Sequence, residues 1–322
     1  MQDIYVGIDI SKDKFDAAVS NQNVKEIKHS IFENNEKGYE NFLKHLKKNY
    51  SPTNTYLALE STGPYGIPLA DYFTNNGCLT YVVNPVRVKY FAKGALYNVK
   101  TDKIDSAVIL KFLVYNQSNL HQHKLPSEEE QELKDLLQER TELMNLLQQQ
   151  NNRFKTKISS SKLIKNSFES IKAALEESLK NINERMKILV AETKEIKEKS
   201  DILKSIKGVG DITANTIISM VPEIGKIPQK QLVALVGLAP YASESGKSKK
   251  KSFTRKGRTK VKSVLYMAAL VASKHNPILK DVFQRLISKG KPFNVAITAV
   301  MRKLLVAMNS LLTAYFNKKE FS

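Results

Sequence analysis

Cysteine is nearly absent from this chain of 322 residues, and its single copy, Cys78, cannot form a disulfide within the chain. That scarcity also excludes a cysteine-rich zinc module, and the five histidines form no convincing zinc set. The N-terminal stretch carries acidic residues where a signal peptide needs an apolar core. No uninterrupted apolar run reaches the ~18 residues that cross a bilayer. We therefore expect a cytoplasmic protein without a membrane partner.

Glycine and proline, which break helices, are missing from the middle of the chain. No glycine lies between Gly94 and Gly208, and no proline between Pro126 and Pro222. Apolar residues recur there at helical spacing, with Glu, Lys and Gln between them. They are Leu133, Leu137, Met144, Leu147, Phe154, Ile158, Leu175, Ile182, Leu189, Ile196 and Leu203. We predict coiled-coil helices over 126–200, folded back at Ser159–Ser161 or paired with another chain, since the pattern allows both.

Acidic residues are scarce in the last third of the chain. Residues 201–322 carry 22 basic and 6 acidic side chains, against 15 and 12 in residues 1–125 and 14 and 14 in residues 126–200. Most of the net charge of +19 therefore lies in one region. A region of this kind usually binds a polyanion, and nucleic acid is the default expectation, although a membrane surface or a ribosome would select the same charge.

The first 125 residues alternate short β-like runs with amphipathic stretches, which predicts an α/β domain. The expected strands are 4–10, 15–20, 55–60 and 79–84, and the expected helices include 35–49 and 66–76. Residues 201–322 contain short helical patterns separated by Gly and Pro, so we predict a basic, all-α domain there. The predicted domains are thus 1–125, 126–200 and 201–322.

Four carboxylates of the first domain are candidates for a metal site. Asp9 and Glu60 end apolar strands, and Asp102 and Asp105 share one face at the start of a helix. Acids converging there favour Mg²⁺ or Mn²⁺, which prefer hard oxygen ligands and can assist phosphodiester chemistry. Simpler interpretations are a turn at Asp9, a loop at Glu60 and a helix cap at Asp102. A sugar-kinase fold with similar phosphate loops is a further alternative.

Two features of the basic domain suggest phosphate binding. Residues 202–219 resemble a helix-hairpin-helix, in which Gly208 and Gly210 let the backbone approach DNA. Residues 247–262 then contain nine basic residues and no acidic one, and Ser243, Ser245 and Ser248 lie at the start of this stretch. A serine beside clustered cations has what a phosphoryl-transfer nucleophile needs, although most such serines are turn residues. The basic residues are Lys247, Lys249, Lys250, Lys251, Arg255, Lys256, Arg258, Lys260 and Lys262.

Together these segments resemble the insertion sequence one-ten (DEDD) transposases, also described as bridge-RNA-guided serine recombinases. The resemblance covers nearly the whole chain. It is carried by YVGIDISKDKFDAAV, LALESTGPYG, VVNPVRVKYFAKGALYNVKTDKIDSAVIL, SIKGVGDITANTI, LVGLAPYASESGK and KGRTKVKSVLYMAAL. Each motif alone is modest, whereas their order and spacing are specific.

The resemblance implies a RuvC-like, ribonuclease-H-fold domain whose magnesium ligands fall on Asp9, Glu60, Asp102 and Asp105. It implies a helical transposase domain whose serine becomes covalently linked to DNA, and Ser245 before Gly246 matches that position. It also implies a structured guide RNA that pairs with donor and target DNA, and a homo-oligomer, dimer or tetramer, whose active site is shared between protomers.

Three positions depart from the family pattern. Lys247 stands where a second glycine often follows, Arg258 where asparagine is usual and Lys262 where an arginine is usual. The departures leave Ser243 as the alternative nucleophile. Two other functions stay open from the residues alone: a junction nuclease that uses water, and a non-catalytic nucleic-acid-binding scaffold.

Overall fold

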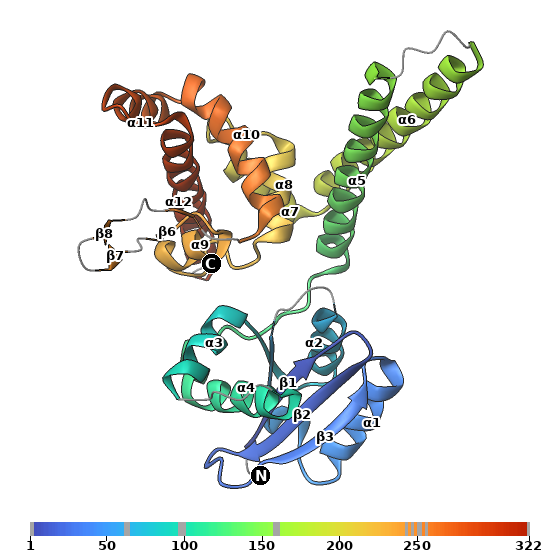
Figure 1. Cartoon of the computed structure of the whole chain (residues 1–322), viewed down its shortest axis with the longest axis vertical. Coiled ribbons are helices and arrows are strands. Elements are labelled where there is room, and N and C mark those ends of the chain that lie inside the picture. The colour runs from blue at the N-terminus through green and yellow to red at the C-terminus, as the bar shows by residue number, and fades with distance from the viewer. Residues whose placement is uncertain are drawn as a thin grey trace. The chain divides into compact units, whose positions relative to one another are not determined.

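The structure, a computed structural model, describes residues 3–60, 65–95, 101–156, 162–241, 244–245, 248–249, 253–254 and 257–320 (Figure 1). The chain divides into two compact units, Met1–Leu125 and Pro126–Ser322. The first unit contains a mixed sheet covered by helices. The described part of the second is helical apart from four two-residue strands. The predicted α/β sheet followed by a helical remainder is confirmed.

The sheet has the strand order β3-β2-β1-β4-β5. Its strands are β1 (Ile4–Ile10), β2 (Lys14–Asn21), β3 (Lys28–Glu33), β4 (Thr55–Glu60) and β5 (Leu79–Val83). Strands β1, β2 and β3 pair antiparallel, whereas β4 pairs parallel with β1 and β5 parallel with β4. The sequence pattern misses β3 because this edge strand is exposed or half-buried throughout, so no apolar run marks it.

Helices cover both sides of the sheet, because successive strand residues face opposite sides. On one side α1 (Glu36–Lys47) and α2 (Gly66–Asn75) pack against β1 in a cluster that includes Ile8. On the other side α3 (Pro85–Gly94) and α4 (Asp102–Asn116) pack in a cluster that includes Tyr5. Two short 3-10 helices, η1 (Pro52–Asn54) and η2 (Gln117–Asn119), complete this unit as described.

Gly7 allows α4 to lie directly against β1. A Cβ at this position would lie 2.2 Å from both the Leu110 nitrogen and the Ser106 oxygen, so any larger residue would push the helix away. The first turn of this helix carries Asp102 and Asp105. Gly7 therefore helps to set how near these two carboxylates lie to the sheet.

The middle of the chain folds back on itself within one molecule. Helices α5 (Glu128–Thr156) and α6 (Lys162–Glu192) run antiparallel, since early residues of one contact late residues of the other. Arg185 lies 2.7 Å from Glu132, and the rings of Phe154 and Phe168 are 5.7 Å apart. The two helices therefore form an intrachain hairpin, one of the two arrangements that the sequence pattern allows.

The C-terminal helices enclose an apolar core. They are α7 (Lys194–Lys204), α8 (Asp211–Met220), α9 (Gln229–Val236), α10 (Thr259–His275), α11 (Pro277–Ser288) and α12 (Phe293–Glu320). Short strands pair as β6 (Pro240–Tyr241) with β9 (Phe253–Thr254), and β7 (Glu244–Ser245) with β8 (Ser248–Lys249). In the described residues, Phe293–Lys319 alone is long and apolar enough to cross a membrane, and half of its most apolar stretch is buried in the structure. Leu304 and Leu305 of this helix lie in the core.

Candidate active site

Asp9 and Glu60 stand at the same edge of the sheet. Strands β1 and β4 are parallel neighbours whose pairing reaches Ile8 and Leu59, and each acid comes one residue later. Both side chains are half-buried. Both also belong to the side of the sheet that α4 covers, because they alternate with residues of the opposite cluster.

Asp102 and Asp105 come from the start of α4. Thr101 is the N-cap of this helix, and its hydroxyl accepts a hydrogen bond of 3.2 Å from the Ile104 N–H. Asp102 is therefore the first helical residue rather than the cap, which removes the simpler interpretation of that acid. The helix dipole favours negative side chains in the first turn, and both carboxylates lie there.

Electrostatic repulsion shows that these acids lie near one another. Burial, followed by the negative charges of Asp105, Asp102 and Glu60, raises the pKa of Asp9 from its ordinary 3.8 to about 6. All four predicted carboxylates thus interact around Asp9. Asp16 adds a weaker repulsion of the same sign.

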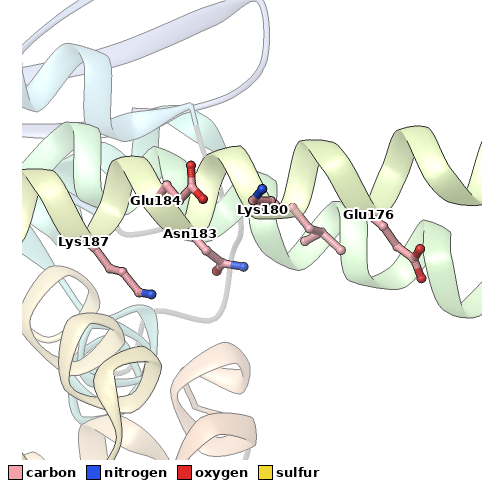
Figure 2. A pocket seen from close by; sticks show the side chains of 6 residues that line it. Glu176, Lys180, Asn183, Glu184 and Lys187 are labelled. Atoms are coloured by element: carbon pink, nitrogen blue, oxygen red, sulfur yellow. The ribbon is translucent and has the colours of Figure 1, made fainter.

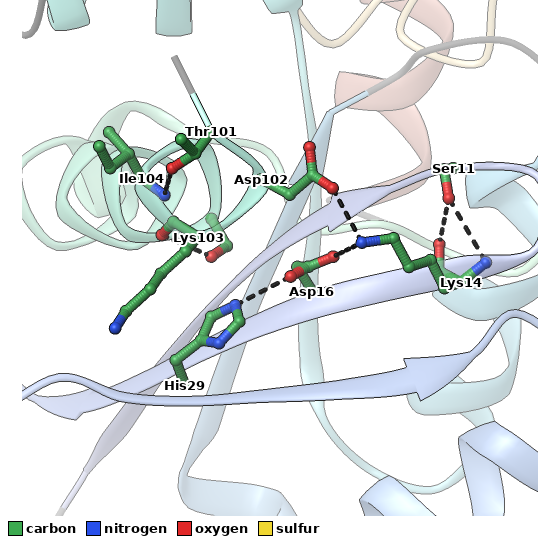
Figure 3. Close-up of polar contacts among 9 residues, drawn as sticks. Ser11, Lys14, Asp16, His29, Thr101, Asp102, Lys103 and Ile104 are labelled. Atoms are coloured by element: carbon green, nitrogen blue, oxygen red, sulfur yellow. Dashed lines mark hydrogen bonds and ion pairs between the residues drawn. The ribbon is translucent and has the colours of Figure 1, made fainter. Parts of the chain in front are cut away.

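Sequence reasoning missed the network that surrounds Asp16. This buried acid contacts Lys14 and His29, and Lys14 also contacts Asp102 (Figure 3). One signal was available: Asp16 interrupts the apolar run FDAAV of an expected strand. A buried carboxylate at such a position needs a partner, yet nothing in the sequence names Lys14 or His29 as that partner.

The donor chemistry of the site suits a hard divalent cation, since it consists of carboxylate oxygens. In the parts of the chain that the structure describes, no three His, Cys, Asp or Glu side chains are close enough to hold a metal ion together. The Lys14 ammonium lies 2.9 Å from the Asp102 Oδ2. A positive group thus occupies one position where a metal ion would bind a carboxylate. The residues fit a metal ion in charge and ligand type.

In the second unit, the predicted pair of short helices around Gly208 and Gly210 is confirmed as α7 and α8. Gly208 has a φ of +107°, and a Cβ there would lie within 2.8 Å of the Ala272 backbone. Only glycine fits this turn against α10 without strain. Gly210 is the N-cap of α8, with no side-chain cap bond. Whether the turn contacts DNA stays a prediction.

Ser245 belongs to β7, where its backbone pairs with Ser248. The backbone of Lys249 is likewise described, in β8. The described residues do not include Ser243 or five of the predicted basic residues, Lys247, Lys250, Lys251, Arg255 and Lys256. Lys260 is exposed and Lys262 half-buried, both on α10.

Both ends of the serine segment, residues 239–256, are fixed to neighbouring helices. Before it, the Arg302 guanidinium donates hydrogen bonds of 2.9 and 3.1 Å to the Leu238 carbonyl. After it, a Cβ at Gly257 would lie 2.3 Å from the Val236 oxygen. Arg258 then donates to both Glu223 carboxylate oxygens, at 2.6 Å from Nη1 and 2.5 Å from Nη2, and to the Met220 carbonyl at 3.0 Å. The charge of Arg258 is thus paired within the chain, and its contact with nucleic acid stays a prediction.

A shallow open depression on α6 has a different character (Figure 2). It is lined by Glu176, Leu179, Lys180, Asn183, Glu184 and Lys187. Acidic and basic side chains mix along this one helix, as they do on a solvated face. None of the predicted site residues lines the depression.

Known protein families match both the segment that contains the four carboxylates and the segment that contains Ser245. Residues 6–162 match the profile of a DEDD family described as "Transposase", and residues 200–284 match "Transposase IS116/IS110/IS902 family". The chain belongs to the IS110 family of transposases. The first match spans all four predicted carboxylates, and the second spans Ser245. As an IS110-family transposase the chain acts on DNA, and DEDD transposases generally use a divalent metal.

Two relatives extend the similarity along the chain. The "Pilin gene-inverting protein" of Moraxella lacunata and that of Moraxella bovis are each 27% identical to it over 310 residues. These residues cover 95% of this chain and 94% of each relative. The similarity to the relatives therefore includes both units of this IS110-family transposase.

Proposed function

We propose that this protein is a recombinase that cuts and rejoins DNA through a covalent phosphoserine link. The proposal is carried by the position of Asp9 and Glu60 at one edge of the sheet and of Asp102 and Asp105 in the first turn of α4, where their mutual repulsion favours a counter-cation. Mg²⁺ is the expected ion, with Mn²⁺ as a substitute. The strand order β3-β2-β1-β4-β5, with its antiparallel meander and two parallel strands, supports a RuvC-like ribonuclease-H fold for this unit.

Ser245 supplies the nucleophile in this proposal. Its Oγ forms a bond to phosphorus, the bond from phosphorus to the bridging oxygen of the leaving strand breaks, and that strand departs with a hydroxyl. The serine proton leaves to a nearby carboxylate or to water. When bound, a divalent ion would polarise the scissile phosphate. Asp9, Glu60, Asp102 and Asp105 would hold that ion, and the covalent link would conserve the energy needed for rejoining without ATP.

Nucleic acids and a second copy of the chain complete the proposal. Donor and target DNA are the substrates, and a structured guide RNA selects them. The basic excess of residues 201–322 supports binding of these polyanions. The protein works as a homo-oligomer in the cytoplasm, bound to the nucleoid when it engages DNA.

Inversion of a DNA segment is a second form of the same activity. It is favoured by the two relatives, each of which is called a pilin gene-inverting protein. Inversion uses the same cutting and rejoining, applied to two sites in opposite orientation on one DNA molecule. A plasmid with inverted sites, read by restriction mapping, distinguishes it from insertion at a separate target.

The decisive experiment looks for the covalent link. The protein is incubated with Mg²⁺, its guide RNA and end-labelled donor and target DNA, and adducts are resolved on a denaturing gel. We expect an adduct with the wild type and with Ser243→Ala, but none with Ser245→Ala. Loss with Ser243→Ala alone would move the nucleophile to Ser243. Cut DNA without any adduct, unaffected by both changes, would instead establish a nuclease that uses water.

A further inference from the structure

Asp16 lies directly opposite Asp9 in the antiparallel pair of β1 and β2. Residues in that relation face the same side of a sheet, so Asp16 is a fifth carboxylate on the side that α4 covers. It differs from the other acids in burial, since it is only 3% exposed. A carboxylate buried this deeply requires a positive or hydrogen-bonding partner.

Two basic side chains meet that requirement. His29 Nε2 lies 2.9 Å from one Asp16 oxygen, and Lys14 Nζ donates to the other at 3.1 Å (Figure 3). Asp16 therefore anchors the Lys14 ammonium from the protein interior. The side chain of His29 is itself largely buried, which leaves Lys14 as the more exposed partner.

The second contact of Lys14 reaches the proposed metal set. Its ammonium donates to the Asp102 Oδ2 at 2.9 Å, and 59% of the Asp102 side chain is exposed. A lysine ammonium is charged at neutral pH, so both contacts are ion pairs. One fixed positive charge thus bridges a buried carboxylate and a proposed metal ligand.

We propose that Lys14 is a positioning residue that holds Asp102 when no divalent ion is bound and competes with that ion for the carboxylate. The inference rests on the proposed metal-binding role of Asp9, Glu60, Asp102 and Asp105. A divalent ion at Asp102 Oδ2 would compete with Lys14 for that oxygen, and the ammonium stays tethered to Asp16 beside the cluster. The carboxylate set consequently binds the ion more weakly than its charge alone would dictate.

This role is tested by whether removing the charge of Lys14 strengthens or weakens the binding of a metal ion. Mn²⁺ alone is titrated calorimetrically into the full chain after treatment with chelator, and the heat lost in Asp9→Asn identifies the carboxylate site. We expect Lys14→Met to bind Mn²⁺ about two- to fivefold more tightly, given the usual strength of an exposed ion pair. Lys14→Arg keeps the charge and should bind like the wild type. A purely structural lysine would show the opposite, since its loss would disorder Asp102 and weaken binding.

Lys12→Met is the matched control. Lys12 is an exposed lysine in the turn that joins β1 to β2, two residues before Lys14, and its change should leave the Mn²⁺ affinity unaltered. Without metal, Lys14→Met should melt at a lower temperature than Lys12→Met, and Mn²⁺ should raise its melting temperature by more. Should Lys14→Met fail to fold, Lys14→Gln removes the charge with a polar side chain and carries the same test.

Two results would overturn the inference. Suppose the uncharged variants bind Mn²⁺ as tightly as the wild type or more weakly, while Asp9→Asn still differs clearly from the wild type. The proposed competition by Lys14 would then be rejected and the metal site retained. Identical titrations of wild type and Asp9→Asn would remove the metal site itself, and the role of Lys14 with it.

Discussion

Charge is arranged in opposite ways in the two units. In the N-terminal sheet, carboxylates gather on one side until they repel, and Asp16 is buried among them. In residues 201–322 the excess is positive, and the core of those helices is apolar. Under the proposed function, the first unit would bind a small cation among its carboxylates, whereas the basic second unit would bind an extended anion on its surface.

Removing a proposed metal ligand is the strongest way to test that contrast. Asp102→Asn should lower strand cleavage by on the order of a thousandfold, because a divalent ion contributes several kcal/mol to phosphoryl transfer. DNA and RNA binding should persist, since they depend on the basic unit. Cleavage is measured on end-labelled DNA and binding by gel shift, with the exposed Asp13→Asn as control. Normal cleavage by Asp102→Asn would end the metal hypothesis.

The packing of α4 against β1, which positions Asp102 and Asp105, is tested next. Gly7→Ala should lower the free energy of unfolding by about 3 kcal/mol, because its Cβ would collide with the α4 backbone. Urea denaturation followed by circular dichroism measures the loss. Gly94→Ala is the control, since a Cβ there meets nothing within 4 Å and should change stability by about 0.5 kcal/mol or less. Equal effects of the two changes would contradict the close approach of α4.

In the basic unit, Arg302 fixes the start of the serine segment. Arg302→Met should reduce the free energy of unfolding by about 1.5 kcal/mol, because the Leu238 carbonyl loses two charged hydrogen bonds. The yield of the protein–DNA adduct should fall as well. The neighbouring, exposed Lys303→Met should alter neither quantity. An unchanged adduct yield would show that the segment keeps its position without Arg302.

The smallest expected effect concerns the pH dependence of stability. Below pH 3.8 Asp9 is neutral in both folded and unfolded chains, and as pH rises through about 6 the folded protein loses stability because charging Asp9 is unfavourable there. In metal-free buffer, Asp9→Asn should therefore be more stable than wild type by about 1 kcal/mol at pH 8, after allowance for solvent screening. Thermal melts at pH 3 and pH 8 measure the difference, which should fall to nearly zero at the lower pH.

The sequence predicted those features of the fold that leave a local pattern. Strands such as Thr55–Glu60 are apolar runs, and the helix at Asp102 was expected from the helical spacing of its residues, although its cap is Thr101 rather than Asp102. The exposed edge strand Lys28–Glu33 has no such pattern and was missed. Likewise, Asp9 and Glu60 were found because strand ends share an edge, whereas the pairing of Lys14 with Asp102 joins positions 88 residues apart. Contacts of that kind depend on tertiary packing, which spacing does not encode.

The intrachain hairpin also sets a length scale. At about 1.5 Å per residue, the 31 residues of α6 span roughly 46 Å, the length of about 14 base pairs of duplex DNA. Its buried residues, Leu179, Met186 and Leu189, all belong to the half that leads into α7, whereas Leu163 near the other end is 79% exposed. Amide hydrogens should therefore exchange slowly at the base of this arm and quickly at its tip. Because the buried residues of α6 lie towards one end, we expect that removing a heptad from the exposed end of each helix would cost little stability.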